Sequence, residues 1–255
     1  MRYAVVTLFA ASLVATAATQ VREVRVMSAG ATAPAYLQLV PAFESMTKQK
    51  AVTLATLTGL GAQSIVARVR AGEPVDVVLI ASNVMDDLVN AGLIRTDSRI
   101  DVARSSIGMA VRAGARRPDI TTVEGLKQAI LNARSIAVSS QISGVYLTNE
   151  LFPKLGVAEQ AAPKTTKVEK GAAGDLVASG EAEIAFQQIS ELRAVKGIDY
   201  VGPLPASVQR ISVFSAGIAA KAPNPAGAKA LLELLMSAEG RGVMQQTGLD
   251  PIAPR

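Results

Sequence analysis

The stretch GEPVDVVLI, residues 72–80, decides the fold class of this chain. Gly72-Glu73-Pro74 ends a helix predicted over residues 63–71, and the nearly continuous apolar run from Val75 to Ile80, which contains Asp76, predicts a strand. Because this run does not alternate with polar residues, we expect both faces of the strand to be covered, as in a parallel sheet. Strands and helices alternate in the same way over residues 24–186, which predicts an α/β architecture with mostly parallel sheets.

The N-terminus has the pattern of a secretory signal peptide. Met1-Arg2 is basic, residues 4–15 are apolar, and Ala15-Thr16-Ala17 fits the small-x-small cleavage pattern. An uncleaved anchor or a buried N-terminal helix would give a similar apolar run. We expect residues 1–17 to be a cleaved signal peptide, the mature protein to be periplasmic, and the remaining chain to lack a membrane span.

The composition excludes several classes of chemistry. The chain has no histidine and no cysteine, which rules out Ser-His-Asp and Cys-His nucleophiles, the usual zinc sites and haem ligation. We therefore expect no metal site and no cofactor. The net charge is +5, but the Lys and Arg residues are scattered without interleaved aromatics, so nucleic acid is not an expected partner. A mild positive field that attracts small anions is the better interpretation.

The domain organisation follows from a missing linker. No Pro-, Gly- or Ser-rich segment separates two α/β units, so the chain should cross between two lobes on extended strands. We place the crossings near residues 101–106 and 205–212. The first lobe then takes residues 22–102 and the return segment 207–255, and the second lobe takes residues 103–206.

Three loops share one design, in which a strand ends, small and hydroxyl residues follow, and a helix begins. They span residues 28–32, 58–64 and 139–146. A helix N-terminus offers free N–H groups and a positive dipole end, so such loops can bind an anion. The alternative is that each loop is simply a capped helix start. The candidate ligand residues in these loops are Ser28, Gly30, Ala31, Thr32, Gln63, Ser64, Ser143, Gly144, Val145 and Tyr146.

A fourth candidate follows the apolar strand that ends at Phe186. The amide of Gln187 could donate to a ligand oxygen without burying a charge. Gln187 and Gln188 could equally be two polar residues that open the next helix.

Four segments resemble the molybdate-binding protein family, the periplasmic components of molybdate and tungstate ABC importers. They are Met27-Ser28-Ala29-Gly30, Gly61-Ala62-Gln63-Ser64, residues 72–77 and Asn90-Ala91-Gly92-Leu93-Ile94. The resemblance implies the type II periplasmic-binding fold, with two α/β lobes joined by two crossover strands around a closing cleft. It also implies a small anionic ligand and an ABC permease as partner, and we expect a monomer. The Ser-Ser pairs of that family are absent here, and Gln187-Gln188 stands where a tyrosine is expected.

The second half is similar to a narrower group, the aconitate isomerases, which are exported proteins on this fold. The matching stretches are Ser98-Arg99, Ser106-Ile107-Gly108, Ala113-Gly114, Pro118-Asp119-Ile120, Ser143-Gly144-Val145-Tyr146, Phe186-Gln187-Gln188, Glu191-Leu192, Val201-Gly202 and Ala216-Gly217-Ile218.

These resemblances leave two functions open. As a binding protein, the chain would hold an oxyanion or a small carboxylate for import. As an isomerase, it would move a proton along aconitate between the cis and trans isomers, and without histidine the proton carrier would be Tyr146, a carboxylate or a lysine. Tyr146 could instead be an aromatic anchor. Arg68, Arg104 and Arg112 are candidate counter-charges for a tricarboxylate, with surface solvation as the alternative.

Overall fold

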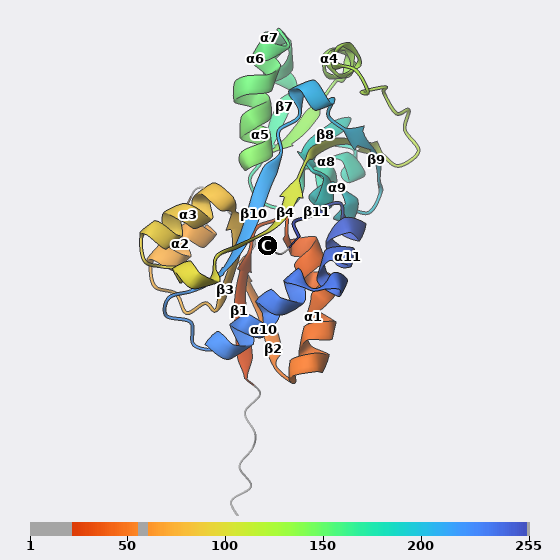
Figure 1. The fold of residues 1–255 in the computed structure, drawn as a ribbon. Helices are drawn as coiled ribbons and strands as arrows, with labels where there is room; N and C mark the ends of the chain where they lie inside the picture. Colours follow the sequence, from red (N-terminus) through yellow and green to blue (C-terminus); the bar gives the residue numbers. More distant parts are fainter. Residues whose placement is uncertain (1–21, 56–60, 254–255) are drawn as a thin grey trace, which may run out of the picture.

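Two lobes, each built on its own β-sheet, make up the molecule (Figure 1). The computed structural model describes residues 22–55 and 61–253, so the predicted signal peptide lies outside the described residues. The sheet of the first lobe has the order β11-β4-β10-β3-β1-β2. Its strands are β1 (Glu23–Ser28), β2 (Lys50–Ala55), β3 (Val77–Ala81), β4 (Ile100–Ser105), β10 (Ser212–Ile218) and β11 (Asp250–Pro251).

The second lobe holds a sheet with the order β7-β6-β8-β5-β9. Its strands are β5 (Ile107–Arg112), β6 (Ile136–Ser139), β7 (Thr165–Val168), β8 (Ile184–Gln188) and β9 (Ile198–Pro203). The helices of this lobe are α4 (Val123–Asn132), α5 (Ile142–Tyr146), α6 (Phe152–Lys154), α7 (Ala158–Ala161), α8 (Ala173–Ser179) and α9 (Ile189–Ala194). A π-helical turn over Leu147–Leu151 joins α5 to α6 into one continuous helix, which begins three residues before the helix that the sequence predicts over residues 145–155.

The apolar run of β3 is buried on both faces, as its sequence predicts. Val77, Leu79 and Ala81 pack in one hydrophobic cluster with residues of α1 (Ala33–Thr47) and α10 (Pro225–Met236). Val78 and Ile80, which point the other way, pack with residues of α2 (Ile65–Arg70) and α3 (Ser82–Asn90). Figure 1 shows α1, α10 and α11 (Ala238–Thr247) on one side of this sheet and α2 and α3 on the other. Burying each Val, Leu or Ile side chain of β3 stabilises the fold by about 1.5–3 kcal/mol, and the strand itself contains no polar residue.

Two segments carry the chain between the lobes. The first is the junction of β4 and β5, where Ser106 separates the last residue of one sheet from the first residue of the other. The second is the return from β9 to β10, over residues 204–211, and β10 then pairs with β4 so that Ser212 lies opposite Ser105. The two crossover strands of the predicted fold are therefore present. The lobe limits at residues 102 and 206 stay a prediction.

The sheets are mixed, whereas the alternation of strands and helices predicts mostly parallel ones. Strand β1 pairs in parallel with β2 and β3, and β6 pairs in parallel with β7 and β8. Strands β5 and β10, however, pair antiparallel with all their neighbours. Each of these two strands enters its sheet from the other lobe, at the edge where the parallel strands end. It must therefore run in the opposite direction.

Candidate functional site

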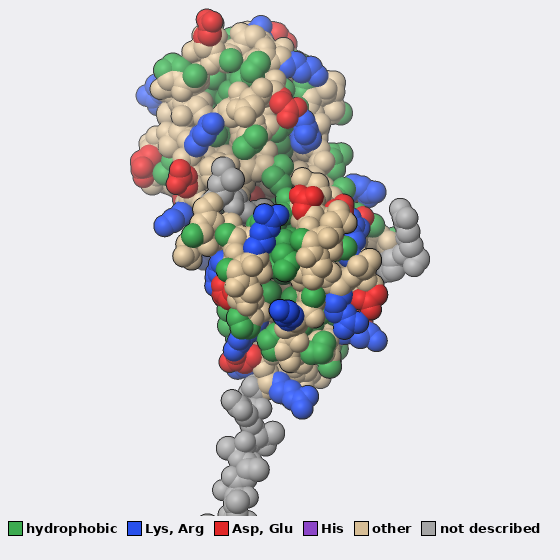
Figure 2. Space-filling model, turned by 90° about the vertical axis from the view of Figure 1, so that its left-hand side faces the viewer, with side chains coloured by type: hydrophobic (Ala, Val, Ile, Leu, Met, Phe, Trp, Pro, Cys, Tyr) green, Lys and Arg blue, Asp and Glu red, His purple; other side chains and the backbone are tan. Residues whose placement is uncertain are grey.

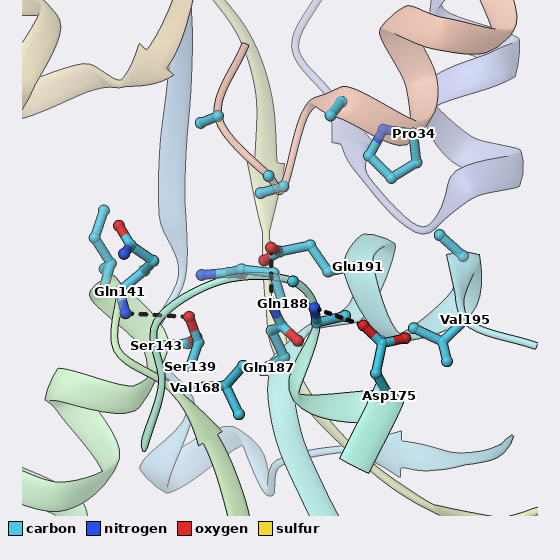
Figure 3. Close-up of a pocket in the computed structure, with 18 of the residues that line it drawn as sticks. Pro34, Ser139, Gln141, Ser143, Val168, Asp175, Gln187, Gln188, Glu191 and Val195 are labelled. Atoms are coloured by element: carbon cyan, nitrogen blue, oxygen red, sulfur yellow. Dashed lines mark hydrogen bonds between the residues drawn. The ribbon is translucent and has the colours of Figure 1, made fainter. Parts of the chain in front are cut away.

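A cavity of about 410 Å³ lies between the lobes. The first lobe lines it with the loop after β1 and the first turn of α1, including Ala29, Gly30, Pro34 and Leu37. The second lobe lines it with the segments that follow β6, β7 and β8 and with α9 (Figure 3). Ligands bind beyond the carboxyl ends of strands in open α/β sheets, and this cavity lies at those ends in both lobes.

The loop of residues 28–32 presents backbone to the cavity and keeps its hydroxyls inside the protein. Ser28 Oγ lies 2.9 Å from Thr32 Oγ1, and Thr32 Oγ1 donates to Ala29 O at 3.0 Å. Both side chains are buried, and neither belongs to the described residues that line the cavity, whereas Gly30 and Ala31 do. Ser28 and Thr32 therefore shape the loop, and Gly30 and Ala31 are the members of this group that a ligand could touch.

The second predicted loop lies partly outside the described residues, which resume at Gly61. Ser64 is the N-cap of α2 and accepts a hydrogen bond from Ala67 N at 3.2 Å. Gln63 is exposed, and neither residue is among the described residues of the cavity wall. The geometry of Ser64 is that of a capped helix start, and the role of both residues as ligands stays a prediction.

The third predicted loop contributes Ser143 to the cavity, together with Ser139 and Gln141. Ser139 Oγ accepts from Gln141 N at 3.1 Å, which orients the turn before α5. Gly144 is buried, and a Cβ added there would overlap the carbonyl oxygen of Ser139. The glycine therefore allows the helix to pack closely against the loop. Neither Gly144 nor Val145 belongs to the described residues that line the cavity, and the side chain of Val145 is exposed.

Tyr146 is buried and points away from this cavity. Its hydroxyl donates to Val208 O at 2.7 Å, and the guanidinium of Arg210 lies 4.5 Å from the centre of its ring. Burial raises the pKa of Tyr146, which is opposite to the direction that the helix dipole alone would give. The contacts are those of an aromatic anchor that holds the return segment to the second lobe. Its catalytic role stays a prediction without support from this geometry.

Gln187 and Gln188 are the last two residues of β8, and α9 begins immediately after them. Gln188 is turned to the crossover strands, because its Oε1 accepts from Ser105 Oγ at 2.7 Å. Gln187 accepts from Ala173 N at 2.7 Å through Oε1. Its Nε2 donates to Glu191 Oε1 at 2.8 Å (Figure 3). Both glutamines line the cavity, but it is Gln187 that contacts an ionisable group.

Glu191 is the residue that our sequence analysis missed as part of a site. It lines the cavity from α9, and burial raises its pKa to about 7, an effect that the hydrogen bond from Gln187 partly opposes. The loop of the first lobe closes against it, since a Cβ on Gly30 would overlap Glu191 Oε1. A carboxyl group with a pKa near neutrality can both take and return a proton, which marks it as a candidate acid–base group. The signal that the sequence offers for it is the stretch Glu191-Leu192, which is part of the resemblance to the aconitate isomerases.

The charge balance of the cavity is less positive than the sequence analysis predicts. Lys196 is the one basic side chain among the described lining residues, which also include Glu169, Asp175 and Glu191. Arg68 forms an ion pair with Glu73 instead. An anionic ligand would therefore depend on Lys196 and on the backbone N–H groups at the start of α1 and of the helix that begins with α5.

The other predicted counter-charges do not reach the cavity. Arg104 and Arg112 are exposed and do not belong to the described lining residues. Lys and Arg side chains are scattered over the face shown in Figure 2, with no continuous basic patch on that face. No helix in residues 22–55 and 61–253 combines the length and the apolar character that crossing a bilayer requires.

The comparisons with known proteins agree with this architecture. The family model of the bacterial extracellular solute-binding proteins matches residues 24–250. An aconitate isomerase from a Pseudomonas species is 38% identical over 237 residues, which cover 92% of this chain and 90% of that protein.

Solved structures show the same fold at low sequence identity. The periplasmic molybdate-binding protein of Azotobacter vinelandii superposes with a TM-score of 0.74 at 20% identity, covering 91% of this chain and 100% of that one. The substrate-binding protein of an ABC transporter from Agrobacterium tumefaciens gives a TM-score of 0.72 at 17% identity, covering 93% and 81%. The chain belongs to the family of bacterial extracellular solute-binding proteins and has their two-lobed type II periplasmic-binding fold.

Proposed function

We propose that this protein is a cofactor-free isomerase that interconverts cis- and trans-aconitate in the cleft between its lobes. The observation that carries the proposal is Glu191, a carboxyl group in the cavity wall whose pKa burial raises to about 7. A carboxyl group with this pKa is about half ionised at neutral pH, so it is available as the base that takes a proton and becomes the acid that returns it.

The reaction needs a single proton carrier. Glu191 as carboxylate removes a proton from the methylene carbon of aconitate, and the electron pair of that C–H bond delocalises over the allylic carbons and the adjoining carboxylate. The protonated Glu191 then delivers the proton to the former vinylic carbon, and the double bond ends one position along. The reaction needs no oxidant or reductant. Its proton carrier is a carboxyl group, which a chain with neither histidine nor cysteine can supply.

The aconitate isomerase relative supports the same assignment. It is 38% identical along nearly the full length of both chains, whereas the molybdate-binding neighbour is 20% identical and supports the fold alone. Charge repulsion from an ionised Glu191 does not separate the two functions, because molybdate and aconitate are both anions. What Glu191 adds is an acid–base group in the cavity wall, which an isomerase needs and an oxyanion-binding site does not.

A second candidate function is solute binding for import, which the family description favours. In that case the cleft would hold a molybdate- or tungstate-like oxyanion or a small carboxylate, with Gly30, Ala31, Ser143 and Gln187 as donors, and deliver it to an ABC permease. For either function we propose a periplasmic location after removal of residues 1–17. We also propose that the lobe of residues 103–206 closes against the rest about the two crossover segments.

Proton NMR separates the two functions. The isomerase proposal predicts that purified protein converts trans-aconitate to a stable mixture with the cis isomer. Thermal melts with molybdate, tungstate and both aconitates serve as the comparison, because a ligand at one hundred times its dissociation constant adds about 2.7 kcal/mol. Stabilisation by molybdate or tungstate, with no conversion of aconitate, would establish the binding function instead.

A further inference from the structure

Gln187 has an amide group whose orientation the protein determines. The side chain is 1% exposed, and its Oε1 accepts a hydrogen bond from Ala173 N at 2.7 Å. Because a backbone N–H can only donate, the amide oxygen must face α8. The NH₂ group therefore faces Glu191, where Nε2 lies 2.8 Å from Oε1.

This contact makes the two oxygens of Glu191 different. Oε1 accepts from Gln187 and also faces Gly30, whose missing side chain leaves just enough room for it. In the described residues no hydrogen bond involves Oε2. An oxygen that accepts an N–H cannot also present a proton along that direction, so Oε2 is the oxygen left to exchange a proton with a substrate.

We propose that Gln187 is a positioning residue, which holds Glu191 so that Oε2 faces the substrate and carries the moving proton. This role rests on the isomerase function proposed above. It differs from the role of ligand donor that the sequence suggests, because the carbonyl and one N–H of the amide are already bonded within the protein. The arrangement reaches across the second lobe, since Ala173 begins α8, Gln187 ends β8 and Glu191 belongs to α9.

Removing the donor has a consequence that simple loss of packing would not have. A hydrogen bond donated to a carboxylate favours its ionised form, so the bond from Gln187 holds the pKa of Glu191 below the value that burial alone would give. In Gln187→Met, which keeps the chain length and lacks the amide, we expect the acidic limb of kcat/KM to move to higher pH by about one unit. We also expect kcat to fall by about tenfold with KM changed less than threefold, because the misplaced group acts in the chemical step.

Gln128→Met is the matched control. The amide of Gln128 donates to Glu124 Oε1 at 2.8 Å, so it forms the same kind of pair on the surface of α4. We expect this variant to keep the pH profile and both kinetic constants of the wild type. An unchanged acidic limb and unchanged kcat in Gln187→Met would overturn the proposal, as would a loss confined to KM.

A second variant and a second readout keep the two proposals separate. Gln187→Glu retains the acceptor for Ala173 N and loses the donor when ionised, so it too should raise the acidic limb if Gln187→Met does not fold. The ¹³C signal of the Glu191 carboxyl, assigned by its absence from Glu191→Gln, reports the same titration without substrate. If the Glu191 titration shifts in the Gln187 variants but the wild type has no isomerase activity, the proposed reaction is wrong, whereas the contact between Gln187 and Glu191 is supported. If the Glu191 titration is unshifted in both Gln187 variants, the positioning role is wrong even when the wild type is an active isomerase.

Discussion

Replacing Glu191 by glutamine should stabilise the protein, and the size of the gain should depend on pH. The substitution keeps the shape of the side chain and an acceptor oxygen for Gln187, but it removes the ionisation. Burial raises the pKa of Glu191 from its ordinary 4.5 to about 7. The native state therefore holds a proton that the unfolded chain has released throughout the interval between these two values.

The sign and the magnitude follow from proton linkage. Between pH 4.5 and 7 the native state binds more protons at Glu191 than the unfolded state, so wild-type stability falls as the pH rises through this window and levels off above it. A difference of about 2.5 pKa units corresponds to about 3 kcal/mol. Glu191→Gln lacks this loss, so it should match the wild type near pH 4 and exceed its stability by up to about 3 kcal/mol at pH 8.

Urea unfolding at a series of pH values measures this difference directly. Glu169→Gln is the matched control, because Glu169 lines the same cavity with an exposed side chain and should leave the pH dependence of stability as it is. The free energy of unfolding of Glu191→Gln, minus that of the wild type, should rise between pH 5 and 8. Parallel curves for the two proteins would show that Glu191 has an ordinary pKa, and the acid–base assignment would then lose its basis.

Two further substitutions test the geometry around this group. Gly30→Ala should lower isomerase kcat/KM by at least about tenfold, because its Cβ would overlap Glu191 Oε1, whereas Gly242→Ala, where the added Cβ meets no atom within 4 Å, should be silent. Steady-state rates that are equal for both glycine variants would contradict this contact. Tyr146→Phe should cost about 1 kcal/mol in urea unfolding through the lost hydrogen bond and leave the isomerase rate within a few fold. A hundredfold loss of rate in this variant would instead return Tyr146 to the role of proton carrier that the sequence suggests.

The fold could largely be predicted from local patterns. The apolar spacing predicts a helix over residues 123–132, which are the bounds of α4, and Thr122 caps it by accepting from Gly125 N. The pattern likewise predicts a helix over residues 225–236, which are the bounds of α10, with Asn224 as its cap. The direction of β5 and β10 could not be predicted from local patterns. Strand direction depends on the lobe from which the chain enters the sheet, and the periodicity of the side chains is the same for both directions.

The site was harder to predict, since it depends on contacts between distant parts of the chain. Ser190 Oγ donates to Ala31 O at 2.7 Å across 159 positions of sequence, and this buried contact fixes α9 against the loop of the first lobe. Glu191 acquires its raised pKa from that packing, and in sequence it is an ordinary helical glutamate. Conversely, the sequence predicts the hydroxyls of Ser28 and Thr32 as ligand donors, yet in the structure they form a hydrogen bond with each other inside the protein.

Whether Glu191 carries the moving proton is decided by the rates of aconitate interconversion at pH 8, measured for the wild type, Glu191→Gln and Glu169→Gln. General acid–base catalysis contributes about 10²–10⁴ in rate, so Glu191→Gln should lose at least about a hundredfold in kcat while a thermal melt shows that it still binds trans-aconitate. Glu169→Gln should retain most of the wild-type rate. Full activity in Glu191→Gln would contradict the role of Glu191 as proton carrier, because the proton would then have to move through another group.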